Sequence, residues 1–146
     1  MALVDTFEHL LGRWSLTRQI EDALTATASH FEGTATWSET TEPAAVARTA
    51  SLLEVGELTS GAHHGEARRS LLSTLAPSGI VELCFADGRS FADLDLRAGP
   101  WRSVHRCGDD TYEITTVASG PSTIEERWRV RGPAKDYEAI SVLTRW

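Results

Sequence analysis

Three side chains that could take part in chemistry share predicted strand faces with tryptophans: Arg18, His105 and Glu126. Residues two apart on a strand point to the same side of a sheet, so we expect all three to turn inward with the indoles. A charge that faces a closed protein interior is costly unless it is paired or binds a ligand. These residues are therefore the first candidates for a binding or catalytic site.

The guanidinium of Arg18 could hold a ligand carboxylate, phenolate or enolate through paired hydrogen bonds. Alternatively, Arg18 forms a salt bridge with an inner carboxylate such as Glu126, or lies exposed near the mouth of a barrel. Glu126 could act as a general base whose pKa is raised by burial, or it could be the structural partner of Arg18 or Arg69. The sequence leaves these alternatives open.

Two further groups could move protons. His105 has an ordinary pKa close to neutrality, which suits an acid or a base, although a hydrogen-bonded structural role is equally open. Tyr112 follows a predicted turn, and its hydroxyl could reach the same interior. Cys107 faces the same way as His105, but side chains two apart on a strand seldom form a nucleophile–base pair. The candidate catalytic residues are therefore Glu126, His105, Arg18 and Tyr112.

Aromatic side chains would form the walls of this interior. Four tryptophans and a phenylalanine fall on predicted inner faces, where they either fill the interior or surround a flat, aromatic or polyene-like guest. Core packing is the simpler expectation for Trp14. The candidate ligand-binding residues are Arg18, Trp14, Trp37, Phe31, Arg69, Trp101, His105, Trp128 and Tyr137.

The sequence contains no motif for a metal or a cofactor. His105 and Cys107 have no second pair at metal-ligand spacing, since His63 and His64 fall in a predicted Gly-rich loop. Gly-rich phosphate loops, dinucleotide fingerprints, nucleophile elbows and His-Glu-x-x-His motifs do not occur. We expect neither a metal site nor a cofactor.

The segments that must position these residues are short and alternate in polarity. A helix is predicted over 4–11, where apolar residues recur with a helical period and a glycine follows. The predicted strands are 13–20, 31–38, 46–58, 67–75, 80–86, 90–96, 101–107, 111–118, 123–131 and 137–146. Asp87-Gly88 is a strong hairpin signal between two of them. About ten short strands with frequent turns predict an all-β antiparallel barrel or sandwich, as a single domain over 1–146.

Residues near the two ends of the chain indicate how such a barrel would close. Gly12 and Trp14 open the first strand, and Arg145 lies near the end of the last one. The indole is expected to plug one end of the barrel with the guanidinium flat over its face, a contact worth roughly 0.5–2 kcal/mol. A barrel of this size is either filled by side chains or holds one small ligand.

The same three residues resemble the signature of the lipocalin-like (calycin) superfamily, a Gly-x-Trp opening and an arginine in the last strand. Nearly the whole chain also resembles an uncharacterised microbial family of single-domain proteins. The shared pieces are Leu11-Gly12-x-Trp14-x-Leu16-x-Arg18-x-Ile20, Phe85-x-Asp87-Gly88-Arg89-x-Phe91, His105-x-Cys107-x-x-Asp110-x-Tyr112 and Trp128-x-Val130-x-Gly132-Pro133-x-Lys135-Asp136-Tyr137. Ala92 stands where that family has a histidine. The resemblance implies a lipocalin-like barrel and carries no established activity.

Composition argues against several classes of partner. The formal net charge is −7 and basic residues do not cluster, so we expect no nucleic-acid partner. No apolar run approaches the roughly 20 residues of a membrane span, and the N-terminal residues lack the basic region of a signal peptide. Two cysteines without signs of secretion predict free thiols and a cytoplasmic location. A homodimer is compatible with the sequence.

The expected function is binding of one small, largely apolar organic molecule with an anionic or carbonyl oxygen inside the barrel. Arg18 would anchor the oxygen, the tryptophans would form the walls, and His105 and Glu126 would orient the guest. The alternative is a cofactor-independent cyclase, isomerase or dehydratase, of the kind found in secondary-metabolite biosynthesis. There Arg18 would stabilise oxyanion charge while Glu126 or His105 moved protons. A third reading is a fully packed barrel that serves as an interaction module.

Overall fold

A computed structural model describes residues 3–41 and 46–146 of the chain. One short helix precedes ten strands: α1 (Thr6–Leu10), β1 (Gly12–Asp22), β2 (Thr27–Thr40), β3 (Thr49–Ser60), β4 (His63–Leu75), β5 (Val81–Cys84), β6 (Ser90–Leu94), β7 (Trp101–Cys107), β8 (Asp110–Gly120), β9 (Thr123–Gly132) and β10 (Lys135–Arg145). The strands form one antiparallel sheet in the order β6-β5-β4-β3-β2-β1-β10-β9-β8-β7. This confirms the predicted all-β antiparallel barrel with a short N-terminal helix.

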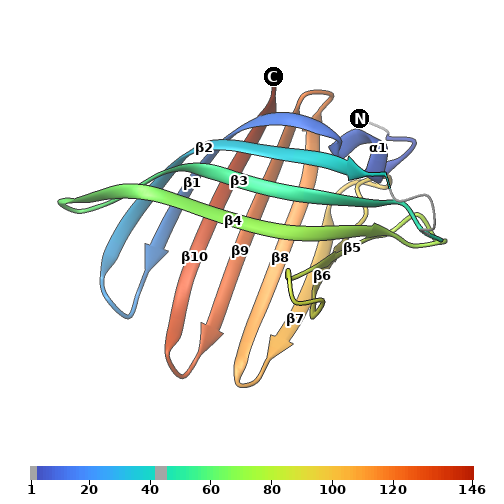
Figure 1. Cartoon of the computed structure of the whole chain (residues 1–146). Helices are drawn as coiled ribbons and strands as arrows, with labels where there is room; N and C mark the ends of the chain where they lie inside the picture. Colours follow the sequence, from blue (N-terminus) through green and yellow to red (C-terminus); the bar gives the residue numbers. More distant parts are fainter. Residues whose placement is uncertain (1–2, 42–45) are drawn as a thin grey trace.

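The sheet curls until its two edge strands, β6 and β7, approach each other (Figure 1). No strand ladder joins these two edges within the described parts of the chain. Side chains bridge them instead: the Trp101 indole donates to Asp93 Oδ1 at 3.0 Å, and the Asp93 amide donates to Ser103 Oγ at 3.2 Å. The barrel is therefore nearly closed, with a seam that is held by side chains.

Tight curvature between β2 and β3 depends on two glycines that face each other. Gly33 and Gly56 are partners in the ladder. A Cβ on Gly33 would lie 2.1 Å from the Val55 carbonyl oxygen, and one on Gly56 would lie 2.3 Å from that of Glu32. Only residues without a Cβ permit this approach, which lets β2, β3 and β4 run across the front of β10, β9 and β8 in Figure 1.

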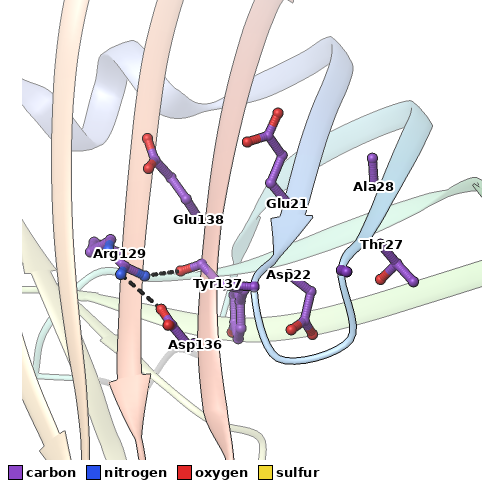
Figure 2. Close-up of a pocket in the computed structure, with 10 residues that line it drawn as sticks. Glu21, Asp22, Thr27, Ala28, Arg129, Asp136, Tyr137 and Glu138 are labelled. Atoms are coloured by element: carbon purple, nitrogen blue, oxygen red, sulfur yellow. Dashed lines mark hydrogen bonds and ion pairs between the residues drawn. The ribbon is translucent and has the colours of Figure 1, made fainter.

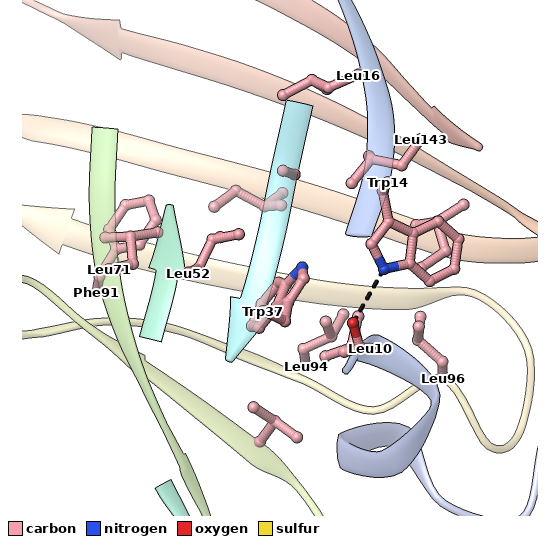
Figure 3. Close-up of a cluster of buried hydrophobic side chains, with 14 of the residues drawn as sticks. Leu10, Trp14, Leu16, Trp37, Leu52, Leu71, Phe91, Leu94, Leu96 and Leu143 are labelled. Carbon is pink, nitrogen blue, oxygen red and sulfur yellow. Dashed lines mark hydrogen bonds between the residues drawn. The ribbon is translucent and has the colours of Figure 1, made fainter. Parts of the chain in front are cut away.

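One end of the barrel is filled by apolar side chains beneath α1 (Figure 3). Asp5 caps the helix by accepting a hydrogen bond from the Glu8 amide. Trp14 is fully buried there, and its indole donates to the Leu10 carbonyl at 2.9 Å. The Arg145 guanidinium stacks 4.1 Å from the centre of the Trp14 ring, so the predicted stack is confirmed.

Several predicted boundaries were wrong. The helix spans Thr6–Leu10 instead of 4–11, and the segment predicted over 80–86 contains a shorter strand, Val81–Cys84. His63 and His64 lie in β4, not in a loop, because the chain turns tightly at Gly61, whose φ is +61°. The turn between β3 and β4 is therefore shorter than the polar residues around it indicate.

Candidate functional site

An ion-pair cluster occupies the middle of the barrel. Arg18 on β1 and Arg69 on β4 both bind Glu54, which lies on the intervening β3. The Nη1 and Nη2 atoms of Arg18 donate to Oε1 and Oε2 of Glu54, each at 3.1 Å. Arg69 Nη2 donates to Oε2 at 3.1 Å, and Arg69 Nε lies 3.0 Å from Oε1. Each carboxylate oxygen of Glu54 therefore contacts both guanidiniums.

Further contacts fix the two arginines. Arg18 Nε donates to Ser141 Oγ at 2.7 Å, and Ser141 is fully buried. Arg69 lies over the Trp128 indole, with its guanidinium carbon 4.8 Å from the ring centre. Burial alone would raise the pKa of Glu54, but the charges of Arg69 and Arg18 hold it below its ordinary value. Glu54 is therefore a carboxylate at neutral pH.

Arg18 turns inward, and among the sequence alternatives the structure shows its pairing with an interior carboxylate. The main partner is Glu54 and not Glu126, however, and Glu54 was missed in the sequence. Glu54 shares one face of β3 with Leu52 and Leu58, because residues an even number of positions apart on a strand point to the same side, and this is the inner face. That signal is obscured because Val55 adds an apolar residue to the opposite face.

Glu126 on β9 faces the same cluster with weaker pairing. Its Oε1 atom lies 3.9 Å from Arg18 Nη2, beyond hydrogen-bond distance. Burial raises the pKa of Glu126, and the nearby charges of Arg18 and Arg69 offset only part of this rise. Glu126 is therefore less fully paired than Glu54.

Two chambers adjoin the ion-pair cluster. The outer chamber lies towards the end of the barrel opposite α1, called the open end below, and has a volume of about 160 Å³. Its walls include Arg18, Ile20, Phe31, Glu54, Leu58, Ala67 and Arg69. The inner chamber has about 40 Å³. Its walls include Trp37, Leu52, Glu54, Arg69, Leu71, Phe91, Ile114, Thr116, Glu126, Trp128 and Leu143. Glu54 and Arg69 border both spaces, so the two chambers adjoin along these side chains.

The interior tryptophans differ in how their N–H groups are satisfied. Trp14 and Trp101 donate to Leu10 and Asp93. Among the described residues, the indole nitrogens of Trp37 and Trp128 are buried without a hydrogen-bond partner. These two side chains are only 7% and 8% exposed, and both border the inner chamber. Most buried polar groups in proteins are hydrogen-bonded, so two unpartnered donors on one small chamber are unusual.

The other predicted site residues lie outside these chambers. Trp14 belongs to the closed end, and Trp101 spans the seam. His105 and Tyr112 stack near Phe91, and the Tyr112 hydroxyl lies 2.7 Å from Lys135 Nζ. The structure thus brings together Arg18, Phe31, Arg69, Trp37, Glu126 and Trp128 around the chambers. His105 and Tyr112 do not border the chambers, but they stack on Phe91, and Tyr112 also stacks on Trp128, so they lie behind two walls of the inner chamber.

Tyr137 borders a third hollow, at the β1–β2 and β9–β10 turns, of about 410 Å³ (Figure 2). Its other charged walls are mostly acidic, and Arg129 is paired there with Asp136 at 2.7 Å. Burial raises the pKa of Tyr137. Across residues 3–41 and 46–146, no three His, Cys, Asp or Glu side chains gather closely enough to hold a metal ion. In the same residues, no helix is both long and apolar enough to cross a membrane.

The fold is similar to that of several solved structures. An S-type phycobiliprotein lyase, CPES, from Guillardia theta matches with a TM-score of 0.70 and 14% identity, covering 100% of this chain and 93% of the lyase. A redesigned β-barrel, mFAP0, bound to DFHBI matches with a TM-score of 0.49 and 11% identity, covering 94% of this chain and 99% of the design. A de novo fluorescence-activating barrel matches with a TM-score of 0.47 and 12% identity, covering 99% of this chain and 100% of the design.

Sequence comparison gives a narrower result. No curated protein is similar enough in sequence to match this chain. A family model does match, and it extends from residue 10 to residue 145. This span includes all ten strands and the whole ion-pair cluster. The chain belongs to the family of unknown function DUF6314.

Proposed function

We propose that this barrel binds one small, largely apolar molecule that carries a carbonyl or anionic oxygen. The observation that carries the proposal is the pair of unpartnered indole N–H groups on the inner chamber, those of Trp37 and Trp128. An unpaired buried donor costs about 1–3 kcal/mol, and a guest oxygen would remove that cost. Such oxygens accept two hydrogen bonds, so one atom could serve both donors.

The composition of the two chambers supports the same proposal. Small-molecule sites are concave and mostly apolar, with a few fixed polar groups. Here Phe31 and Leu58 give the outer chamber apolar walls, while Arg18, Glu54 and Arg69 form a polar surface where the two chambers adjoin. Because these charges already satisfy one another, a largely apolar guest can bind beside them without exposing an unpaired ion.

The binding test uses three bicyclic probes: 2-acetonaphthone, 2-naphthoate and naphthalene. We expect the first or second to quench protein tryptophan fluorescence saturably, with naphthalene binding at least tenfold more weakly. The variant Ala67→Phe fills the outer chamber and should abolish binding. Thr17→Phe adds the same ring to the exposed face of β1 and is the matched control. Equal binding by Ala67→Phe and the control, or no binding by any probe, would contradict the proposal.

A second function is favoured by the position of Glu126, a weakly paired carboxyl on the wall of the inner chamber whose pKa is raised by burial. A buried carboxyl whose pKa moves towards neutrality suits general acid–base chemistry. With a guest carbonyl held by indole N–H groups, Glu126 could take a proton from the carbon next to the carbonyl. The resulting enolate would recover a proton from the same carboxyl. An isomerase, cyclase or dehydratase could be built on this step. The phycobiliprotein lyase with a similar fold indicates that the architecture is compatible with an enzyme.

Exchange of the methyl protons of 2-acetonaphthone in D₂O tests this second function. An enzyme would accelerate exchange above the buffer rate, and Glu126→Gln would remove the acceleration while binding persisted. A carrier would bind the ketone without changing its exchange rate.

A further inference from the structure

We infer that the inner chamber selects a neutral group in which an N–H or O–H donor lies next to a carbonyl oxygen. The donor would face Glu126, and the oxygen would face the indole N–H groups of Trp128 and Trp37. This inference rests on the proposed function and specifies the chemistry that the chamber recognises. Lactams and carboxylic acids in their neutral form belong to this class.

Arg18 is not free to anchor a ligand, and Arg69 is largely engaged as well. Three nitrogens of Arg18 are engaged, one by Ser141 and two by Glu54. Arg69 uses the remaining face of the Glu54 carboxylate. An anionic guest on Arg18 would have to displace Glu54, which is 5% exposed and would then be a buried charge with fewer partners. The cluster therefore has a structural role: it links β1, β3 and β4.

The inner chamber keeps three hydrogen-bonding groups that are not paired with each other or with the ion-pair cluster. Glu126 is an acceptor with no cation within hydrogen-bond distance, and its nearest guanidinium nitrogen is 3.9 Å away. Within residues 3–41 and 46–146, the indole N–H groups of Trp37 and Trp128 are donors without partners. One acceptor and two donors match a guest that presents a donor and a carbonyl oxygen.

The acceptor Glu126 and the donor Trp128 are neighbours on one strand face. Glu126 and Trp128 are two residues apart on β9, so they point to the same face, roughly 7 Å apart along the strand. The Trp128 indole N–H is turned towards Glu126 and lowers its pKa, at a geometry that falls short of a full hydrogen bond, so both groups keep capacity for a guest. Neighbouring acceptor and donor groups call for neighbouring donor and acceptor atoms on the guest.

The volume of the inner chamber limits which part of a guest it can hold. A volume of about 40 Å³ accommodates a small head group and not a whole bicyclic molecule. The remainder of the guest would pass Arg69, whose side chain is 33% exposed, into the outer chamber of about 160 Å³. There Ile20, Phe31 and Leu58 offer an apolar surface.

The test compares 2-quinolone, a lactam with adjacent N–H and C=O groups, with N-methyl-2-quinolone, which has lost the donor. We expect 2-quinolone to bind wild type at least tenfold more tightly, about the worth of one buried hydrogen bond. Glu126→Leu should reduce 2-quinolone affinity to that of the methylated probe. Glu125→Leu on the exposed face of β9 is the matched control and should bind like wild type.

Indole N–H signals in ¹⁵N–¹H spectra give a second readout that does not depend on variants folding well. The signals of Trp37 and Trp128 should move when 2-quinolone binds, and those of Trp14 and Trp101, which already have partners, should stay in place. Equal affinity for both quinolones, or unmoved Trp37 and Trp128 signals, would overturn the inference. If 2-acetonaphthone still binds in that case, the proposed function stands; if no probe binds, both fail.

Discussion

Glu54 joins two guanidiniums that would otherwise be separate charges inside the barrel. Its carboxylate faces Arg18 on one side and Arg69 on the other. Because Arg18 and Glu54 have largely left water, the contacts of the cluster must offset the cost of burying these two charges. The cluster is therefore sensitive to the loss of its one shared anion.

Glu54→Gln is expected to destabilise the protein by about 3–5 kcal/mol, because it leaves two guanidiniums without their carboxylate. Urea unfolding followed by circular dichroism measures this loss. Glu113→Gln is the matched control, since Glu113 pairs with Arg102 on the surface and should lose no more than about 1 kcal/mol. Equal losses in the two variants would show that the interior cluster adds no more than an exposed pair.

Glu126 should make stability depend on pH in the opposite direction from an ordinary paired carboxylate. Burial raises its pKa in the folded state above the ordinary value of 4.5, so the native protein holds a proton that the unfolded chain releases. This contribution is complete below pH 4.5 and is lost as pH rises through the folded-state pKa. Glu126→Gln mimics the protonated form. We expect the variant to gain stability relative to wild type between pH 4 and pH 7.

Thermal unfolding at several pH values measures this difference. Glu125→Gln, on the exposed face of the same strand, should show no such trend. A Glu126→Gln variant that loses stability relative to wild type as pH rises would mean that Arg18 stabilises the ionised carboxylate after all.

For single residues, the sequence predicts which face of the sheet a side chain lies on better than it predicts the partner that the side chain binds. Strand alternation placed Arg18 and Glu126 on inner faces, where the structure has them. It could not choose between their partners, because the pairing of β1 with β3 and β4 residues depends on how the barrel curls. Core packing was predicted for Trp14, but the sequence could not separate Trp101 from Trp37 and Trp128, since the N–H partner of Trp101 lies on another strand.

The strand elements meet at a seam that has side chains in place of a ladder. Asp93 connects β6 to β7 through Trp101 and Ser103. Leu83, Phe91, Ala92 and Asp93 border both the inner chamber and a surface groove of about 250 Å³ beside β7. The seam is therefore a thin part of the wall.

Trp101→Phe should loosen this seam by removing the indole donor to Asp93. We expect amide hydrogens in β6 and β7 to exchange at least tenfold faster, while those in β1 and β10 keep their wild-type rates. Hydrogen–deuterium exchange measures both. Trp146→Phe is the control, because Trp146 is exposed and stacks only on Arg13. Unchanged exchange in β6 and β7 would show that the Trp101–Asp93 bond does not hold the edges together.

The crossing of β2 and β3 gives a second element-scale prediction. Gly33→Ala would bring a Cβ within 2.1 Å of a backbone oxygen, so the strands must separate. We expect a loss of about 1–3 kcal/mol or more in the free energy of unfolding. Gly65→Ala on β4 has open space around its Cβ and should stay within about 1 kcal/mol of wild type. Equal stability of both variants would contradict the role of Gly33 in the curvature.

The elements themselves were largely predictable, because alternation and turn residues are local signals. All ten strands and the Asp87-Gly88 hairpin appear in the structure. Non-local features were not predictable. The seam and the Gly33–Gly56 approach depend on which strands meet once the sheet curls.

At the scale of the whole molecule, the barrel divides into layers along its axis. Apolar side chains under α1 fill one end, and the inner chamber, the ion-pair cluster and the outer chamber follow towards the open end. Apolar burial at the filled end stabilises the fold. The middle of the barrel can therefore contain polar groups that lack a hydrogen-bond partner. A fully packed barrel would have no such groups.

Nuclear Overhauser contacts between a bound probe and protein methyl groups test the central claim, that a guest binds inside the barrel. With 2-acetonaphthone we predict contacts to Leu58 in the outer chamber and to Leu71 and Ile114 in the inner one. The exposed methyl groups of Leu72, Val104 and Ile140 are the internal controls. Contacts to these surface methyl groups alone, with none to the chambers, would contradict the account.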